Sequence, residues 1–108
     1  MHGVPTITVQ QLAEALASPE PPQLLDVRED AEVAQSSLEN IIHIPLMHLP
    51  DNLSKLDPEV PIAVICRVGG RSAHATALLI QEGFTAANVA GGMVAWVAEV
   101  DPSLPPVA

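Results

Sequence analysis

The sequence predicts an α/β fold of three layers, in which a mostly parallel five-stranded sheet carries helices on both faces. The first observation behind this prediction is that short apolar segments alternate with helix-like stretches along the 108-residue chain. Strands separated by helices need crossover connections, which place the strands parallel. The second observation is that 48% of the residues are hydrophobic but only 2% are aromatic. Small aliphatic residues of this kind are typical of strands buried on both faces.

The length is that of one globular domain, and the sequence has no visible internal repeat. We expect a single domain over residues 1–100. The C-terminal segment 101–108, DPSLPPVA, has three prolines in eight residues and cannot continue a helix or a central strand. We expect this segment to be a loose tail.

The first half of the chain is expected to alternate strands and helices. In chain order these are a strand over residues 7–9, a helix from residue 9 or 10 to residue 17, a strand over 24–27, a helix over 29–35 and a strand over 41–44. Thr8 is a suitable N-cap for the first helix. Pro45 suits the first position of a short helical segment, because proline is tolerated where the missing N–H is not needed.

The second half contains the most apolar strand of the chain. It is expected over residues 61–65 and is followed by a helix over 72–82, a strand over 87–90 and a last helix that leads from Gly91-Gly92 through Trp96. The helix over 72–82 is apolar almost all round, so other elements should cover most of it. Trp96 is expected to pack in the core.

The charge balance excludes several classes of function. The chain has thirteen acidic residues and four basic ones, and its net charge is −9. The basic residues are Arg28, Lys55, Arg67 and Arg71. Binding to nucleic acid or to an anionic membrane needs a basic surface that this chain cannot form. Its apolar runs are too short to cross a bilayer, and we expect a cytoplasmic protein. The acidic surface suits a basic partner, or serves solubility alone.

The single cysteine, Cys66, rules out an internal disulfide framework. The histidines share no ligand spacing, so we expect no metal site, and no cofactor is implied. His74 is expected on the surface of its helix rather than at a site. The acidic stretch of Glu29, Asp30 and Glu32 is expected to be a solvated helix start.

Cys66 stands at the carboxyl end of the most apolar strand, where parallel α/β sheets bind their ligands. The loop that follows, Cys66-Arg67-Val68-Gly69-Gly70-Arg71, runs into a helix expected to begin near Ser72. Its glycines permit positive φ, so the backbone amides and the helix N-terminus can converge on one point and form an anion cradle. Flanking arginines lower the pKa of a thiol further. We therefore expect a nucleophilic thiolate, and the same amides would stabilise a persulfide, Cys–S–S⁻.

Three segments, LLDVRE, VICRVGGRS and GGMVAW, give the chain a resemblance to the rhodanese family over nearly its whole length. The resemblance implies that Cys66 carries sulfur and that the loop residues Arg67, Val68, Gly69, Gly70 and Arg71 hold the persulfide. It also implies that Asp26 and Arg28, with Ser72, support the loop, and that Trp96 packs in the last helix. The chain departs from the family at residues 36–41, SSLENI, where rhodaneses carry a GHIxGA-like segment.

The activity implied is that of a thiosulfate sulfurtransferase, which moves sulfur from a donor such as thiosulfate to cyanide or a thiol. Arg67 and Arg71 would orient the anionic donor. A second hypothesis is a carrier or regulatory module that receives persulfide from, or passes it to, a protein partner without turnover of its own. Cysteine phosphatases and arsenate reductases are less favoured, because their Cys-x5-Arg loops are one residue longer than this one and encircle a whole oxyanion.

Overall fold

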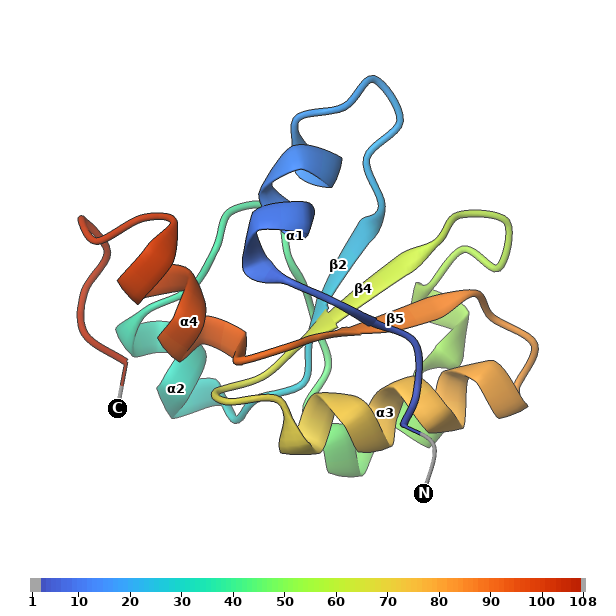
Figure 1. Ribbon diagram of the computed structural model, residues 1–108. Helices are drawn as coiled ribbons and strands as arrows, with labels where there is room; N and C mark the ends of the chain where they lie inside the picture. Colours follow the sequence, from blue (N-terminus) through green and yellow to red (C-terminus); the bar gives the residue numbers. More distant parts are fainter. Residues whose placement is uncertain (1–2, 108) are drawn as a thin grey trace.

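The computed structural model describes residues 3–107 (Figure 1). Its five strands are β1 (Thr6–Ile7), β2 (Gln23–Asp26), β3 (Ile42–His43), β4 (Ile62–Ile65) and β5 (Ala86–Val89). Its α-helices are α1 (Val9–Leu16), α2 (Asp30–Gln35), α3 (Gly70–Gln81) and α4 (Gly92–Glu99), and the segment between β3 and β4 forms the 3-10 helices η1 (Leu46–Asp51) and η2 (Leu53–Lys55).

The strands form one parallel sheet in the order β1-β5-β4-β2-β3. β4 is the central strand, with β2 and β5 on either side. Asp26 at the end of β2 is in register with Ile65 at the end of β4. The ends of β2 and β4 therefore meet at the same edge of the sheet, where Cys66 follows β4 directly.

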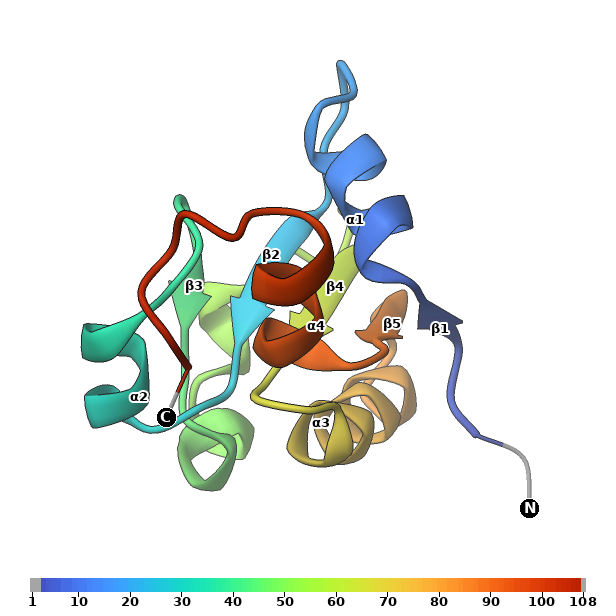
Figure 2. The same ribbon diagram turned by 60° about the vertical axis from the view of Figure 1, so that its left-hand side comes forward.

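The two faces of the sheet pack against different helices (Figures 1 and 2). Along β4, Ile62 and Val64 belong to the core beneath α3 and η1, whereas Ala63 and Ile65 belong to the core beneath α1 and α4. Alternate residues of a strand point to opposite faces, so this division places a layer of helices on each side. The predicted three-layer α/β fold is confirmed.

The predicted element boundaries differ from the structure by small shifts. The first strand ends at Ile7 because Thr8 caps α1, as expected: its hydroxyl accepts from the Gln11 amide, and the Gln11 side chain accepts from the Thr8 amide. α3 begins at Gly70, before the expected start at residue 72, and α4 continues past Trp96 to Glu99.

The tail is less loose than expected over the part that the structure describes. Residues 101–107 contain no helix or strand, but Leu104 and Val107 are partly buried against the core beneath α1 and α4. The domain boundary at residue 100 stays a prediction. Within the described residues, no helix combines the length and the apolar character that a membrane span requires.

Candidate functional site

The loop at the carboxyl end of β4 is shorter than the sequence suggested, because its last residues belong to α3. Gly69 takes φ +114, in the left-handed region, and is the N-cap of α3. Gly70 is the first residue of that helix, and its φ is not positive. Both loop glycines were expected to permit positive φ, and of the two only Gly69 uses this freedom. The turn at Gly69 brings the start of α3 back towards Cys66.

Backbone amides and one hydroxyl contact the Cys66 sulfur. The Gly69 amide donates to Sγ at 3.1 Å and the Ser72 amide at 3.3 Å, while Ser72 Oγ lies 3.1 Å from Sγ. Cys66 is only 1% exposed, so the sulfur lies at the base of the loop with these groups around it. Amides that converge in this way form the anion cradle expected from the glycine-containing loop.

The surroundings of Cys66 act on its pKa in opposite directions. Burial raises the pKa of the thiol, but hydrogen bonds from the Ser72 hydroxyl and from the Ser72, Gly69 and Val68 amides together lower it, and the net shift is below the ordinary value. The amides stabilise the thiolate more than the neutral thiol, and the Ser72 hydroxyl does so when it donates its hydrogen to sulfur. The site therefore favours negative charge on sulfur.

Ser72 is held by a residue that the sequence analysis missed. Its hydroxyl donates to Asn88 Oδ1 of β5 at 2.5 Å, and its carbonyl accepts from the Thr76 hydroxyl at 2.7 Å. A serine has one hydroxyl hydrogen, so Ser72 cannot donate to Asn88 and to sulfur at once. Asn88, which is buried, therefore influences whether the hydroxyl serves the sulfur.

Arg71 makes an ion pair that corrects the expectation for the acidic stretch. Both of its terminal nitrogens donate to Glu32 of α2, with Nη1–Oε1 at 2.6 Å and Nη2–Oε2 at 2.8 Å. Glu32 is therefore not merely part of a solvated helix start. The hydrogen bonds from Arg71 lower the pKa of Glu32 to about 2, against the opposing effect of burial. The guanidinium fork is engaged with a carboxylate, although its charge still interacts with Cys66.

Asp26 and Arg28 form a fully buried ion pair next to the loop. Arg28 Nη2 donates to Asp26 Oδ2 at 2.8 Å and to the Ser36 carbonyl at 2.8 Å, and its Nη1 donates to the Glu32 carbonyl at 3.4 Å. The pair thus ties the end of β2 to α2. Since α2 also carries the carboxylate that holds Arg71, the pair supports one anchor of the loop.

The N-terminus of α4 fixes the first two carbonyls of the loop. The Met93 amide donates to the Cys66 carbonyl at 2.9 Å and the Val94 amide to the Arg67 carbonyl at 3.1 Å. Gly92, at φ +55, lies so close that a Cβ built on it would stand 2.6 Å from the Arg67 oxygen and nearer still to the Cys66 oxygen. Only glycine permits this approach, a constraint that the motif GGMVAW contained but the sequence analysis did not recognise.

Other candidate residues have side chains at the surface or in the core. Arg67 and Val68 are exposed, Val68 by 54%. His74 is exposed on α3, and Trp96 is buried, as expected. Among the described residues, no group of three or more His, Cys, Asp or Glu side chains is placed to hold a metal ion.

The fold and the loop define a class of protein: a three-layer α/β domain with a lone cysteine held by backbone amides at the carboxyl end of its central strand. Comparison with known proteins gives the family. The rhodanese-like domain model matches residues 8–99, and the chain belongs to this family. The resemblance inferred from the three sequence segments is thereby confirmed.

Three relatives of similar length illustrate the match. A protein named "Sulfurtransferase" from Allochromatium vinosum is 33% identical over 91 residues, which cover 83% of this chain and 85% of that protein. The crystal structure of a rhodanese-like domain protein from Staphylococcus aureus is 35% identical with a TM-score of 0.84, over 96% of this chain and 99% of that one. The human single-domain sulfurtransferase TSTD1 is 28% identical with a TM-score of 0.76, over 90% of this chain and 98% of that one.

Proposed function

We propose that the protein is a sulfurtransferase that carries sulfur as a persulfide on Cys66, takes it from a donor such as thiosulfate and passes it to cyanide or a thiol. The observation that carries the proposal is the set of Gly69 and Ser72 amides and the Ser72 hydroxyl around the Cys66 sulfur. Membership of a family with named sulfurtransferases supports sulfur transfer in general; the donor and the acceptor are part of the proposal.

The first half-reaction is attack by the Cys66 thiolate on the outer sulfur of thiosulfate. A sulfur–sulfur bond forms on Cys66, the sulfur–sulfur bond of thiosulfate breaks, and sulfite leaves with the electron pair. In the second half-reaction cyanide attacks the outer sulfur of the persulfide, thiocyanate leaves and the Cys66 thiolate returns. No general base is needed once the thiolate exists, and preorganised amides stabilise the charge on sulfur throughout.

A specific observation also favours the second hypothesis, a carrier module that exchanges persulfide with a protein partner. Arg71 would orient a small anionic donor, but both of its terminal nitrogens donate hydrogen bonds to Glu32. Cys66 itself is 1% exposed. A site with few available groups for selecting a small donor suits delivery by a protein that brings its own recognition.

Intact-mass spectrometry after incubation with thiosulfate tests both hypotheses. The wild type should gain the mass of one sulfur atom, and the gain should disappear on treatment with cyanide or a reducing thiol. Cys66→Ser, which exchanges only the sulfur for oxygen, is the matched control and should gain nothing. An adduct of equal yield on the Cys66→Ser protein would contradict the proposal.

Steady-state turnover then separates the two hypotheses. Thiocyanate production from thiosulfate and cyanide, abolished in Cys66→Ser, supports the enzyme. A stoichiometric adduct on Cys66 with no turnover above that of the Cys66→Ser protein supports the carrier instead.

A further inference from the structure

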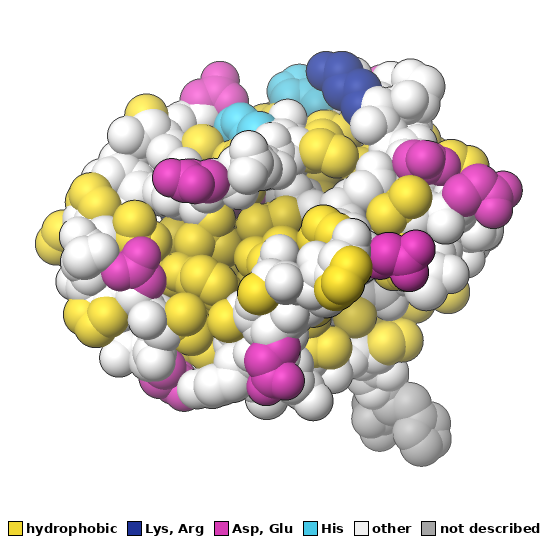
Figure 3. Space-filling model, turned by 90° about the horizontal axis from the view of Figure 1, so that it is seen from above, with side chains coloured by type: hydrophobic (Ala, Val, Ile, Leu, Met, Phe, Trp, Pro, Cys, Tyr) yellow, Lys and Arg dark blue, Asp and Glu magenta, His cyan; other side chains and the backbone are white. Residues whose placement is uncertain are grey.

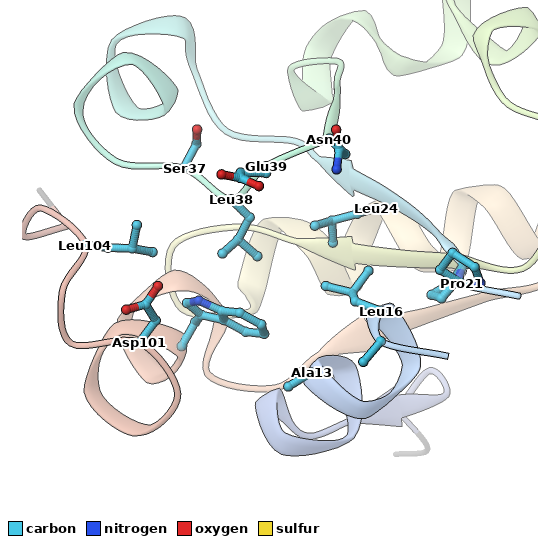
Figure 4. A pocket seen from close by; sticks show the side chains of 13 residues that line it. Ala13, Leu16, Pro21, Leu24, Ser37, Leu38, Glu39, Asn40, Asp101 and Leu104 are labelled. Atoms are coloured by element: carbon cyan, nitrogen blue, oxygen red, sulfur yellow. The ribbon is translucent and has the colours of Figure 1, made fainter. Parts of the chain in front are cut away.

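A second candidate site lies on the face of the sheet covered by α1 and α4. It is a pocket of about 590 Å³, visible from above as a hydrophobic hollow (Figure 3). Leu16, Leu24 and Leu38 point into it from three segments of the chain (Figure 4). No residue from Cys66 to Arg71 lines this pocket, so it is distinct from the sulfur loop.

The pocket contains a hydrogen-bond donor without an acceptor. Trp96 lines it and is 9% exposed, and its Nε1 is buried with no partner among the described residues. A buried polar group without a partner is unfavourable, and such groups are few in folded proteins. A ligand that offers a carbonyl oxygen to this N–H would remove the cost.

One wall of the pocket is the segment in which this chain departs from its family. Ser37 stands where the GHIxGA-like motif has its histidine, and Asn40 stands at the second glycine, where it takes φ +57. Asparagine tolerates this left-handed conformation better than most residues. Ser37, Leu38, Glu39 and Asn40 all line the pocket. A serine fills far less space than an imidazole, so the departure changes the wall of this pocket.

The charge around the pocket has one sign. Glu39 and Asp101 line it, whereas no lysine or arginine does. Glu39 is exposed and pairs with no cation among residues 3–107, and Asp101 Oδ1 accepts from Ser103. Figure 3 shows Asp and Glu side chains around the hollow, whereas the Lys or Arg side chains in this view lie away from it, at the upper edge of the molecule. With a net charge of −9 for the whole chain, this rim complements a cationic ligand.

We propose that this pocket binds a segment of a partner protein that carries aliphatic side chains beside a lysine or arginine. The aliphatic side chains fill the hollow, a backbone carbonyl accepts from Trp96 Nε1, and the cation lies between Glu39 and Asp101. One extended peptide supplies all three groups. The inference does not rest on the proposed sulfur transfer, since it uses no residue of the loop.

The position of the pocket also suits docking near the sulfur. Trp96 lies four residues after Gly92 on α4, about 6 Å along the helix axis. The amides just after Gly92 hold the carbonyls of Cys66 and Arg67. A partner seated on the pocket is therefore one helical turn from the loop.

The experiment is a selection of random heptapeptides against the folded wild-type protein, with counter-selection against Ala13→Phe, in which an aromatic ring grows from a residue that lines the pocket. Enriched peptides should combine aliphatic residues with lysine or arginine. One of them is synthesised and titrated while the indole N–H resonance of Trp96 is followed by NMR; since the chain has one tryptophan, the signal reports on the pocket alone. The resonance should shift on binding.

Matched variants test each part of the site by calorimetry. Ala13→Phe should weaken binding of the selected peptide at least tenfold while it keeps the wild-type circular dichroism spectrum. Trp96→Phe, which removes only the donor and part of the ring, should weaken binding several-fold. Glu39→Gln should weaken it about two- to fivefold, as for an exposed ion pair, whereas Glu59→Gln, an equal change of charge at an exposed residue outside the pocket, should not.

The proposal is overturned if the selection enriches no peptides, or enriches acidic ones. It is also overturned if the enriched peptides bind Ala13→Phe as tightly as the wild type, or bind without moving the Trp96 resonance. Loss of persulfide formation on Cys66 would leave these results unchanged, so the two proposals fail separately.

Discussion

Gly92→Ala is the substitution whose effect the structure determines most closely. The new Cβ would stand 2.6 Å from the Arg67 oxygen, against backbone that cannot rotate away, and the residue would have to keep φ +55. Overpacking costs about 1–3 kcal/mol, and a left-handed non-glycine residue costs at least about 1 kcal/mol more. We expect the free energy of unfolding to fall by about 2–4 kcal/mol.

The relief available to Gly92→Ala is to move α4 away from the loop, which breaks the hydrogen bonds from Met93 and Val94 to the loop carbonyls. Persulfide formation on the folded fraction should then slow as well. Gly70→Ala is the matched control, because a Cβ at Gly70 meets nothing within 4 Å and its φ is not positive. Urea denaturation and intact-mass kinetics measure both effects. Equal free energies of unfolding for Gly92→Ala and Gly70→Ala would contradict the expected clash at Gly92.

The ion pairs around the loop give two further predictions. Glu32→Gln should lower the free energy of unfolding above pH 4.5 and lose this effect as the pH falls towards 2, because the folded-state pKa of Glu32 is lowered from 4.5 to about 2, chiefly by Arg71. Urea titrations across this pH range measure the effect, and an equal loss at both ends of the range would contradict the prediction. Arg28→Met should cost about 3–5 kcal/mol, because it leaves the buried Asp26 carboxylate without its partner. The double variant Arg28→Met with Asp26→Asn should lose less unfolding free energy than Arg28→Met alone. A loss equal to or larger than the sum of the two single variants would contradict this.

Much of the fold was predictable because local pattern and global topology agree. Alternating strands and helices require a parallel sheet, and the most apolar strand proved to be central, with Cys66 at its end. The glycine loop was likewise predictable, since Gly69 has to take a left-handed conformation before the helix. These features depend on residues close together in the sequence.

The contacts that the sequence did not reveal join residues far apart in the chain. Glu32 meets Arg71 from 39 positions away, and Asn88 meets Ser72 from 16. Acidic residues are common in the first turn of a helix, so the sequence does not distinguish Glu32 from its acidic neighbours. Which acidic residue of the first turn faces the loop depends on how α2 packs at the sheet edge. The capping pattern contains no information on this packing.

The pocket was also beyond the sequence analysis, although one sign of it was present. The departure at residues 36–41 identified a segment with altered side chains, but not that it faces Trp96 across a hollow. Trp96 is buried as predicted, yet a packing pattern gives no information on whether the indole N–H has an acceptor. That follows only from the arrangement of α4 against the segment between α2 and β3.

The central claim is that the loop amides and Ser72 stabilise negative charge on the Cys66 sulfur, and the pH dependence of its alkylation tests this most directly. The rate of iodoacetamide modification, followed by intact mass, reports the thiolate fraction. The midpoint should lie below that of an ordinary cysteine thiol, because the hydrogen bonds outweigh burial, and it should be higher in Ser72→Ala. A wild-type midpoint at or above the ordinary value, unchanged by Ser72→Ala, would contradict it.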